Sequence, residues 1–260
     1  MNILVPTDFS AISLNAAQFA IRMLTGQYEA KIILYHVYAK ANDAADASGK
    51  LDALKEQLAQ DGIVKIECVL EESSDFIESL ERKIKHLGVG LVVMALNDKT
   101  KFEQVVSSSN SLRLIDKNVC PVLVIPHDAK FNGLKNVALA CDFVDVQNAI
   151  PIVPVKNVLA LFNPSLHIVN INSEIYVSLT EEYLDQRSRM IEMFEEFKPD
   201  FYFITTYDFH ETLRQFIDDK NIDMVITFPR KHGYINNLIK GNNTKKLVIE
   251  SAIPVLAAHG

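Results

Sequence analysis

The chain has 260 residues, of which 48% are hydrophobic and 23% are charged, so it is globular and long enough for two domains of ordinary size. Its formal net charge of −7 excludes a uniformly basic surface and argues against nucleic acid as a partner. No apolar run approaches the roughly 18 residues that span a bilayer, and no basic leader opens the chain, so we expect a cytoplasmic protein without a membrane partner.

In the first half of the chain, apolar runs of strand length alternate with helical patterns. Runs such as IILYHV and PVLVI are apolar without alternation, which is typical of parallel strands covered on both faces. Between these runs, apolar residues recur at helical spacing. The pattern predicts an α/β three-layer sandwich, with strands at residues 2–6, 31–38, 64–70, 90–94 and 121–126.

The pattern then begins again. The stretch KNVALACDF repeats NILVPTDF, so that Asp142 stands where Asp8 stood, an offset of 142 − 8 = 134 residues. The stretches DFIESL and DFHETL, and CPVLVIP and IPVLAAH, match at nearly the same offset. Matches at a fixed offset indicate a tandem duplication. We therefore predict two domains, residues 1–130 and 131–260, joined by the polar segment HDAKFNGLK.

One helix of the second domain should differ from its counterpart in the first. The segment after Asp142 contains Pro151 and Pro154, and proline inside a helix removes a hydrogen bond and clashes with the preceding turn. Proline is tolerated at the start of a helix. We therefore expect this helix to begin late, near Pro154.

The cysteines and histidines show no spacing typical of a metal site. Cys68, Cys120 and Cys141 lie far apart, as expected of small buried side chains in a reducing compartment. The histidines are dispersed as well, so we predict no metal. Paired acids such as Glu71–Glu72 look like solvated surface positions, and no nucleophile or base accompanies them. We predict no enzyme activity from these residues.

The duplicated pattern resembles the universal stress protein family, and the chain resembles a tandem member with two such domains. The resemblance rests on the strands that end at Asp8 and Asp142, the runs LVVMAL and MVITFP, and the two closing strands. It covers nearly all of the chain. It implies two tandem open parallel five-stranded sheets in the order 3-2-1-4-5, with helices on both faces. Ligands bind such sheets at the switch point between strands 1 and 4.

The resemblance also implies which residues would contact a nucleotide. Thr7 and Asp8 end the first strand, where nucleotide-binding relatives contact the adenosine part of ATP and an acid can accept hydrogen bonds from ribose hydroxyls. His36 and Val37 end the second strand, where the backbone would face an adenine. A histidine satisfied by its neighbours is the simpler interpretation of His36. For Asp8 a structural role as helix N-cap stays open, and Ser10 could serve as the cap instead.

The phosphate-binding loop departs from the family pattern of Gly, two residues, Gly, nine residues, Gly and Ser or Thr. In the first domain these positions hold Ala95, Asp98, Ser108 and Ser109. Glycines let backbone amides approach phosphates closely, and the final pair opens a helix whose N-terminus favours an anion. All three glycines are missing, so we expect weak or absent binding of a triphosphate.

The second domain holds Phe228, Lys231, Gly241 and Asn242 at the same four positions. One glycine remains, and the basic trio Arg230, Lys231 and His232 could contact an anion. A solvated basic loop without a ligand is the competing interpretation.

We therefore predict a cytoplasmic stress-response or regulatory binding protein with degenerate nucleotide-binding loops. The alternatives are a genuine ATP or AMP binder and a weak adenine-nucleotide hydrolase. Its cofactor is unknown from the sequence, and its partners would be a small anion or nucleotide and an unidentified protein. The apolar closing strands favour pairing of the two domains into an intramolecular pseudo-dimer, and a homodimer of whole chains stays open.

Overall fold

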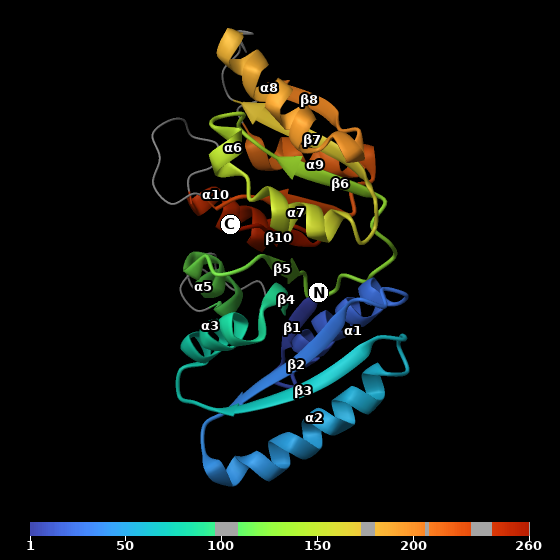
Figure 1. The fold of residues 1–260 in the computed structure, drawn as a ribbon, viewed down its shortest axis with the longest axis vertical. Helices are drawn as coiled ribbons and strands as arrows, with labels where there is room; N and C mark the ends of the chain where they lie inside the picture. Colours follow the sequence, from blue (N-terminus) through green and yellow to red (C-terminus); the bar gives the residue numbers. More distant parts are fainter. Residues whose placement is uncertain (97–108, 173–179, 206–207, 230–240, 260) are drawn as a thin grey trace. The chain divides into compact units, whose positions relative to one another are not determined.

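The structure, a computed structural model, describes residues 1–96, 109–172, 180–205, 208–229 and 241–259 (Figure 1). The chain forms two compact units, Met1–Asn132 and Gly133–Gly260. The division between them falls inside the segment HDAKFNGLK, where the sequence predicts a linker.

The first unit is an α/β unit with five parallel strands in the order β3-β2-β1-β4-β5, and this confirms the predicted order. Helices α1 and α2 lie on one face of the sheet, and α3 and α5 lie on the other (Figure 1). In chain order the elements are β1 (Asn2–Pro6), α1 (Ala11–Leu24), β2 (Lys31–Tyr38), a 3-10 turn (Ala41–Asp43), α2 (Ala44–Leu58), β3 (Lys65–Glu72), α3 (Phe76–Leu87), β4 (Val89–Ala95), α5 (Asn110–Lys117) and β5 (Val122–Ile125).

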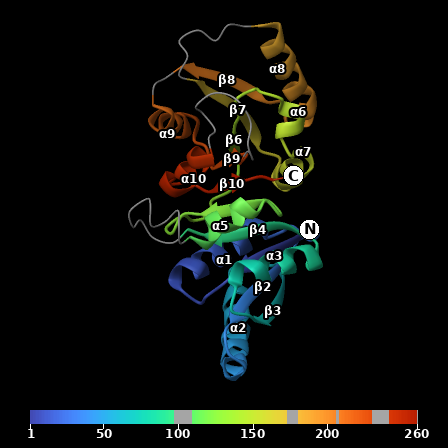
Figure 2. The same cartoon turned by 90° about the vertical axis from the view of Figure 1, so that its left-hand side faces the viewer.

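The second unit repeats this arrangement, with parallel strands in the order β8-β7-β6-β9-β10. Helices α6, α7 and α8 lie on one face, and α9 and α10 lie on the other (Figure 2). Its elements are β6 (Asn136–Ala140), α6 (Val146–Ala149), α7 (Ile152–Leu159), β7 (Ser165–Asn172), α8 (Glu181–Met193), a 3-10 turn (Glu195–Phe197), β8 (Asp200–Thr205), α9 (Phe209–Lys220), β9 (Met224–Thr227), α10 (Gly241–Glu250) and β10 (Val255–Ala257).

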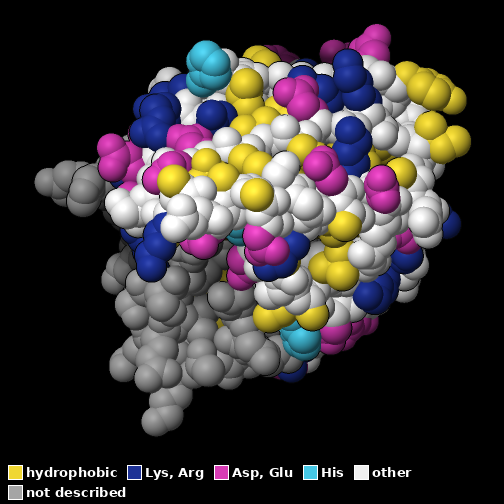
Figure 3. Space-filling view, turned by 90° about the horizontal axis from the view of Figure 1, so that it is seen from below, with side chains coloured by type: hydrophobic (Ala, Val, Ile, Leu, Met, Phe, Trp, Pro, Cys, Tyr) yellow, Lys and Arg dark blue, Asp and Glu magenta, His cyan; other side chains and the backbone are white. Residues whose placement is uncertain are grey.

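The core of each unit lies between its sheet and its helices because the strands are apolar on both faces. Ile3, Leu4 and Val5 on β1 are fully buried, and so are Val137 and Leu139 on β6. On the face of the molecule shown in Figure 3, Lys and Arg side chains are interspersed with Asp and Glu side chains. Interspersed charge of this kind does not attract a polyanion as a basic patch would.

The prediction that the first helix of the second unit begins late is wrong, because the short helix α6 already begins at Val146. Helix α7 begins at Ile152 rather than near Pro154, with Pro151 as its N-cap residue. Pro154 lies in the first turn of α7. The N–H groups of a first turn have no carbonyl acceptor within the helix, so the missing N–H of proline costs little stability there. The short helix α6 comes before α7 and was not predicted.

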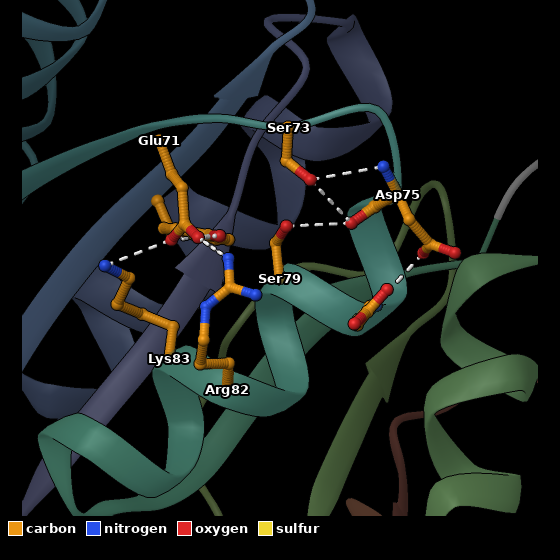
Figure 4. A network of polar contacts seen from close by, with 8 residues as sticks. Glu71, Ser73, Asp75, Ser79, Arg82 and Lys83 are labelled. Carbon is orange, nitrogen blue, oxygen red and sulfur yellow. Dashed lines mark hydrogen bonds and ion pairs between the residues drawn. The ribbon is translucent and has the colours of Figure 1, made fainter.

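The prediction that Glu71 is a solvated surface acid is wrong. Glu71 lies on β3, and its side chain is only 12% exposed. It accepts a hydrogen bond of 2.9 Å from the hydroxyl of the fully buried Tyr35. It also forms ion pairs with Lys83, at 3.0 Å, and with Arg82 (Figure 4). These contacts fix α3 to the sheet, and α3 carries Phe76 toward the carboxyl ends of the strands.

We expect the Glu71→Ala variant to lose about 2–3 kcal/mol of unfolding free energy, because hydrogen bonds to charged groups contribute about 1.5–3 kcal/mol and the buried Tyr35 hydroxyl loses its charged acceptor. Urea denaturation followed by circular dichroism measures this loss. The neighbouring exposed Glu72, changed to alanine, is the matched control and should change stability by less than about 0.5 kcal/mol. Equal effects of the two substitutions would contradict the assignment of Glu71.

His167 on β7 is a buried titratable group in the second unit, with 8% of its surface exposed. Its Nδ1 lies 3.3 Å from the Tyr202 hydroxyl, and its Nε2 lies 3.4 Å from Asn136 Oδ1. Burial lowers the pKa of His167; the charge of Asp200 opposes this shift and that of Lys220 adds to it. The imidazole of His167 is therefore protonated less readily in the folded unit than in the unfolded chain.

We expect the second unit to lose stability as the pH falls below about 6.5, the ordinary histidine pKa. In that range the unfolded chain takes up a proton that the folded unit does not, so the free energy of unfolding rises with pH. Urea midpoints at about pH 7.5 and about pH 5.5 measure the effect. The His167→Asn variant should lose less stability over this interval than the wild type does. The same loss in both proteins would show that His167 is not the group responsible.

Candidate functional site

The first unit contains a pocket of about 140 Å³ at the carboxyl ends of β1 and β4, the switch point of the sheet. Six segments contribute to its wall: the ends of β1, β2 and β4 and the starts of α1, α3 and α5. Its described lining consists of Pro6, Thr7, Asp8, Ser10, Ser13, His36, Val37, Phe76, Met94, Ala95, Ser109, Asn110 and Ser111.

A sharp turn after β1 places Asp8 at this pocket. The backbone N–H of Thr7 donates to the carbonyl of Tyr35 over 2.9 Å, which extends the pairing of β1 with β2 by one residue. Phe9 then adopts a left-handed conformation with φ of 64°, and its N–H donates to Thr7 Oγ1 over 3.0 Å. A left-handed backbone is uncommon for a bulky residue, and such strain is often stored at functional sites.

Asp8 does not cap the helix that follows, which answers the question left open by the sequence. Ser10 is the N-cap of α1, and its Oγ accepts from the N–H of Ser13 over 3.2 Å. The carboxylate of Asp8 accepts instead from Ser10, from its N–H over 3.0 Å and from its hydroxyl over 2.6 Å. Burial acts to raise the pKa of Asp8, but the hydrogen bonds from the hydroxyl and the N–H of Ser10 oppose it, and that pKa is lowered. Asp8 is therefore an ionised, exposed carboxylate held in one position.

His36 is satisfied by its neighbours, as the simpler interpretation predicts. Its Nδ1 lies 2.7 Å from the carbonyl oxygen of Thr7. Because a carbonyl can only accept, Nδ1 carries the hydrogen, and Nε2 of the neutral ring is an acceptor. The ring of Phe9 lies against the imidazole, with 4.4 Å between ring centroids.

The start of α5 forms the opposite wall. Ser109 precedes the helix, but its side chain makes no capping hydrogen bond. Its Oγ lies 2.8 Å from Ser111 Oγ, and Ser111 donates to the carbonyl of Ala95 over 3.4 Å. Both serines are buried. The N–H groups of the first turn of α5 therefore donate no hydrogen bond to the Ser109 side chain.

The second unit builds the same turn after β6, with Cys141, Asp142, Phe143 and Asn170 in place of Thr7, Asp8, Phe9 and His36. Phe143 is left-handed with φ of 56°, and its N–H donates to Cys141 Sγ over 3.3 Å. Asp142 accepts from the N–H of Val144 over 3.1 Å, and the Asn170 amide donates to the Cys141 carbonyl over 3.0 Å. The duplication seen in the sequence thus extends to individual hydrogen bonds.

The two units differ in what fills the space beside this turn. Met94 pairs with Val124 in the first unit, and Thr227 pairs with Ala257 at the same register in the second, so Phe228 corresponds to Ala95. Phe228 is 3% exposed. On the other side of the turn, the buried ring of Phe143 packs against the rings of Tyr183, Phe201 and Phe203. The second unit therefore has a large aromatic side chain, Phe228, where the first has the small Ala95.

Four of the predicted site residues lie together at the pocket of the first unit. Thr7, Asp8, Val37 and Ser109 all line the pocket of the first unit. Asp142 lies in the equivalent turn of the second unit, and Gly241 and Asn242 are the first residues of α10. The other predicted positions lie outside the described residues: Asp98, Ser108, Arg230, Lys231 and His232.

Sequence reasoning missed Ser13, Phe76 and Ser111 as pocket residues. Ser13 follows Ser10 by one helical turn, and this spacing could have indicated that the two share the pocket. Within the described ranges, no group of three or more His, Cys, Asp or Glu side chains is placed to hold a metal ion. None of the helices in the described part of the chain has the length and apolar character needed to cross a bilayer.

Comparisons with known proteins agree with this architecture. Residues 1–126 match the model of the Universal stress protein family. A universal stress protein from Methanocaldococcus jannaschii is 27% identical over 146 residues, which are 49% of this chain and 83% of that protein. The structure of a universal stress protein from Archaeoglobus fulgidus matches 99% of this chain and 96% of its own, with a TM-score of 0.71 and 18% identity.

The same fold occurs in a protein of another kind. The cytoplasmic domain of a prokaryotic cation chloride cotransporter matches 99% of this chain and 95% of its own, with a TM-score of 0.56 and 11% identity. At this identity the likeness concerns the fold and not the activity.

Proposed function

We propose that this chain, whose residues 1–126 match the model of the Universal stress protein family, is a cytoplasmic regulatory binding protein. Its first unit holds a small adenosine-type ligand, and its second unit does not hold one at the equivalent place. The observation that carries the proposal is the pocket at the β1 and β4 strand ends, with Asp8 at its wall and the small Ala95 at its floor.

The volume of the enclosed part of the pocket favours a ligand no larger than a nucleoside. Pockets for drug-sized ligands are usually about 300–1,000 Å³, whereas a cavity of about 150 Å³ holds a single benzene ring. The cavity of about 140 Å³ formed by the described lining therefore has room for one ring-sized group. The missing glycines of the phosphate loop support the same conclusion, because side chains limit the approach of a triphosphate to the backbone.

The chemistry of the pocket favours binding rather than catalysis. Asp8 has a lowered pKa, which makes it a weak proton acceptor at neutral pH. The hydroxyl of Ser10 donates to Asp8, and that of Ser13 donates to a backbone carbonyl, so neither is paired with a base that would activate it. These hydrogen bonds fix the positions of Asp8, Ser10 and Ser13, and fixed polar groups suit the binding of a ligand.

A cytoplasmic location is part of the proposal. It is supported by the three cysteines, none of which forms a disulfide in the described part of the chain, as expected of a protein in a reducing compartment. Cys120 and Cys141 are buried, and burial raises the pKa of the Cys120 thiol to about 12. A thiol with so high a pKa is inert, so Cys120 acts as a core side chain.

Isothermal titration calorimetry of the full chain with adenosine, AMP and ATP tests the proposal. We expect saturable binding of at least the nucleoside, and at about 100 times the dissociation constant that ligand should add about 2.7 kcal/mol to stability in a thermal-shift assay. Incubation with ATP and magnesium should release phosphate at the same background rate from the wild type and from Asp8→Asn. Absence of binding by all three compounds would remove the proposed function.

A further inference from the structure

The first unit has a second hollow, a cleft of about 580 Å³ between helices α3 and α5. Its volume lies within the range of about 300–1,000 Å³ that is usual for the sites of small organic ligands. Among the described residues, it shares none with the pocket at the ends of β1 and β4, which we call the strand-end pocket. Seven of its eight lining side chains are charged, four as Lys or Arg and three as Asp or Glu. Such a lining favours a ligand that is itself charged and hydrophilic.

Lysines of the two helices meet at one carboxylate in this cleft. Lys85 Nζ of α3 lies 2.8 Å from Glu81 Oε1, and Lys117 Nζ of α5 lies 3.3 Å from Glu81 Oε2. One carboxylate balances one of the two ammonium charges, so the group keeps a positive charge. Arg113 lies one helical turn before Lys117 and adds a guanidinium on the same side of α5. An anion in the cleft therefore meets cations of both helices.

The start of α3 faces the same cations of α5. Asp75 caps α3 and accepts from the N–H of Glu78 over 3.0 Å, and this hydrogen bond lowers the pKa of Asp75. The positive charges of Arg113 and Lys117 lower that pKa further. The remaining cation of the lining, Arg82, is already paired with a carboxylate of the sheet (Figure 4). The other three cations are left to face a ligand.

The second unit carries other residues at the positions of the two lysines. Helix α9 corresponds to α3 at an offset of 209 − 76 = 133 residues, because both have 12 residues and begin with Phe after an Asp cap. At this offset Asp218 and Glu250 stand in place of Lys85 and Lys117. Between α9 and α10, His210 Nδ1 lies 3.6 Å from Glu250 Oε2. The fold packs this pair of helices without the lysines, so the cations of the first unit favour a role in binding.

We propose that the cleft between α3 and α5 is a second binding site of the first unit and that its ligand is a small sugar phosphate. Lys85, Arg113 and Lys117 bind the phosphate group, because charge-assisted hydrogen bonds to phosphate are strong and arginine can hold two of its oxygens at once. The carboxylate of Glu78 accepts hydrogen bonds from the sugar hydroxyls. Inorganic phosphate shares the anionic part of this chemistry, and a free sugar shares the rest. The inference does not depend on the proposed function, which concerns the strand-end pocket.

Isothermal titration calorimetry of the full chain with D-glucose 6-phosphate, D-glucose and inorganic phosphate tests the inference. We expect saturable binding of glucose 6-phosphate, with glucose and inorganic phosphate each weaker by at least about tenfold. Inorganic phosphate that binds as tightly as glucose 6-phosphate would assign the cleft to a free anion. Glucose that binds as tightly would show that the phosphate group is not recognised. Either result, or no binding of glucose 6-phosphate, would overturn the inference.

The Arg113→Gln variant locates the ligand, because it removes one cation of the cleft and leaves the ion pair between Lys117 and Glu81 in place. It should weaken the binding of glucose 6-phosphate by about tenfold or more, and Arg113→Lys, which keeps the charge, should weaken it less. Lys246→Gln is the matched control, since Lys246 holds the position of Arg113 in the second unit, and it should leave the affinity unchanged. Equal affinities of the wild type and Arg113→Gln would place the ligand outside the cleft and refute the proposal.

Discussion

Replacement of Ala95 by phenylalanine is expected to abolish ligand binding by the first unit. Ala95 lines the pocket, whereas Phe228 holds the corresponding position in the second unit and is 3% exposed. A phenylalanine ring is comparable in size to the benzene that fills a cavity of about 150 Å³, so it would occupy most of a pocket of about 140 Å³. Calorimetry with adenosine should then show no saturable heat.

The Ala95→Ser variant is the matched control, because it adds one polar atom and leaves the pocket open. It should bind adenosine within about tenfold of the wild type. Circular dichroism and the urea midpoint of Ala95→Phe show whether the first unit remains folded, since overpacking a core costs typically about 1–3 kcal/mol. A folded Ala95→Phe protein that binds adenosine like the wild type would show that the ligand lies elsewhere.

The Phe228→Ala variant is expected to lose about 3–5 kcal/mol of unfolding free energy from the second unit. Phe228 follows β9 and is buried, so its truncation leaves a cavity that its neighbours fill only in part. Urea denaturation monitored by circular dichroism measures the loss.

Val153→Ala is the control for this substitution, since Val153 on α7 is 64% exposed and should change stability by less than about 0.5 kcal/mol. A loss below about 1 kcal/mol in Phe228→Ala would contradict the conclusion that this ring fills the second unit's interior.

The sequence predicts the strands well because their signals are local. Five apolar runs and their repetition at a fixed offset predict the strands, and the resemblance to the universal stress protein family implies the strand order that each unit adopts. The place of Asp8 follows from the same pattern, since the carboxyl ends of neighbouring parallel strands meet at one edge of a sheet. Thr7, Asp8 and Val37 come together for this reason.

What the sequence could not predict depends on contacts between distant segments. The hydrogen bonds that bring Thr7, Ser10 and Ser13 together depend on the left-handed turn at Phe9, which the residue types do not predict. Ser111 donates to Ala95 because α5 and β4 are brought together by the fold. Glu71 looked like a solvated acid because its partner Tyr35 lies on another strand and Arg82 on a later helix.

The second unit shows the same limit of local patterns. The prolines at 151 and 154 predict a late helix, but α6 forms ahead of it, where Val146 donates its N–H to the Gln186 side chain of α8 over 2.9 Å. That contact depends on the packing of α8 beside α6 and has no counterpart in the local sequence.

The most direct test is the stoichiometry of adenosine binding, measured by calorimetry on the full chain at known protein concentration. It shows whether the strand-end pocket is open in the first unit and filled by side chains in the second. One nucleoside bound per chain, lost in Ala95→Phe and retained in Asp142→Asn, is the result that this structure predicts. Two equivalent sites per chain, or one site that survives Ala95→Phe and disappears in Asp142→Asn, would contradict it.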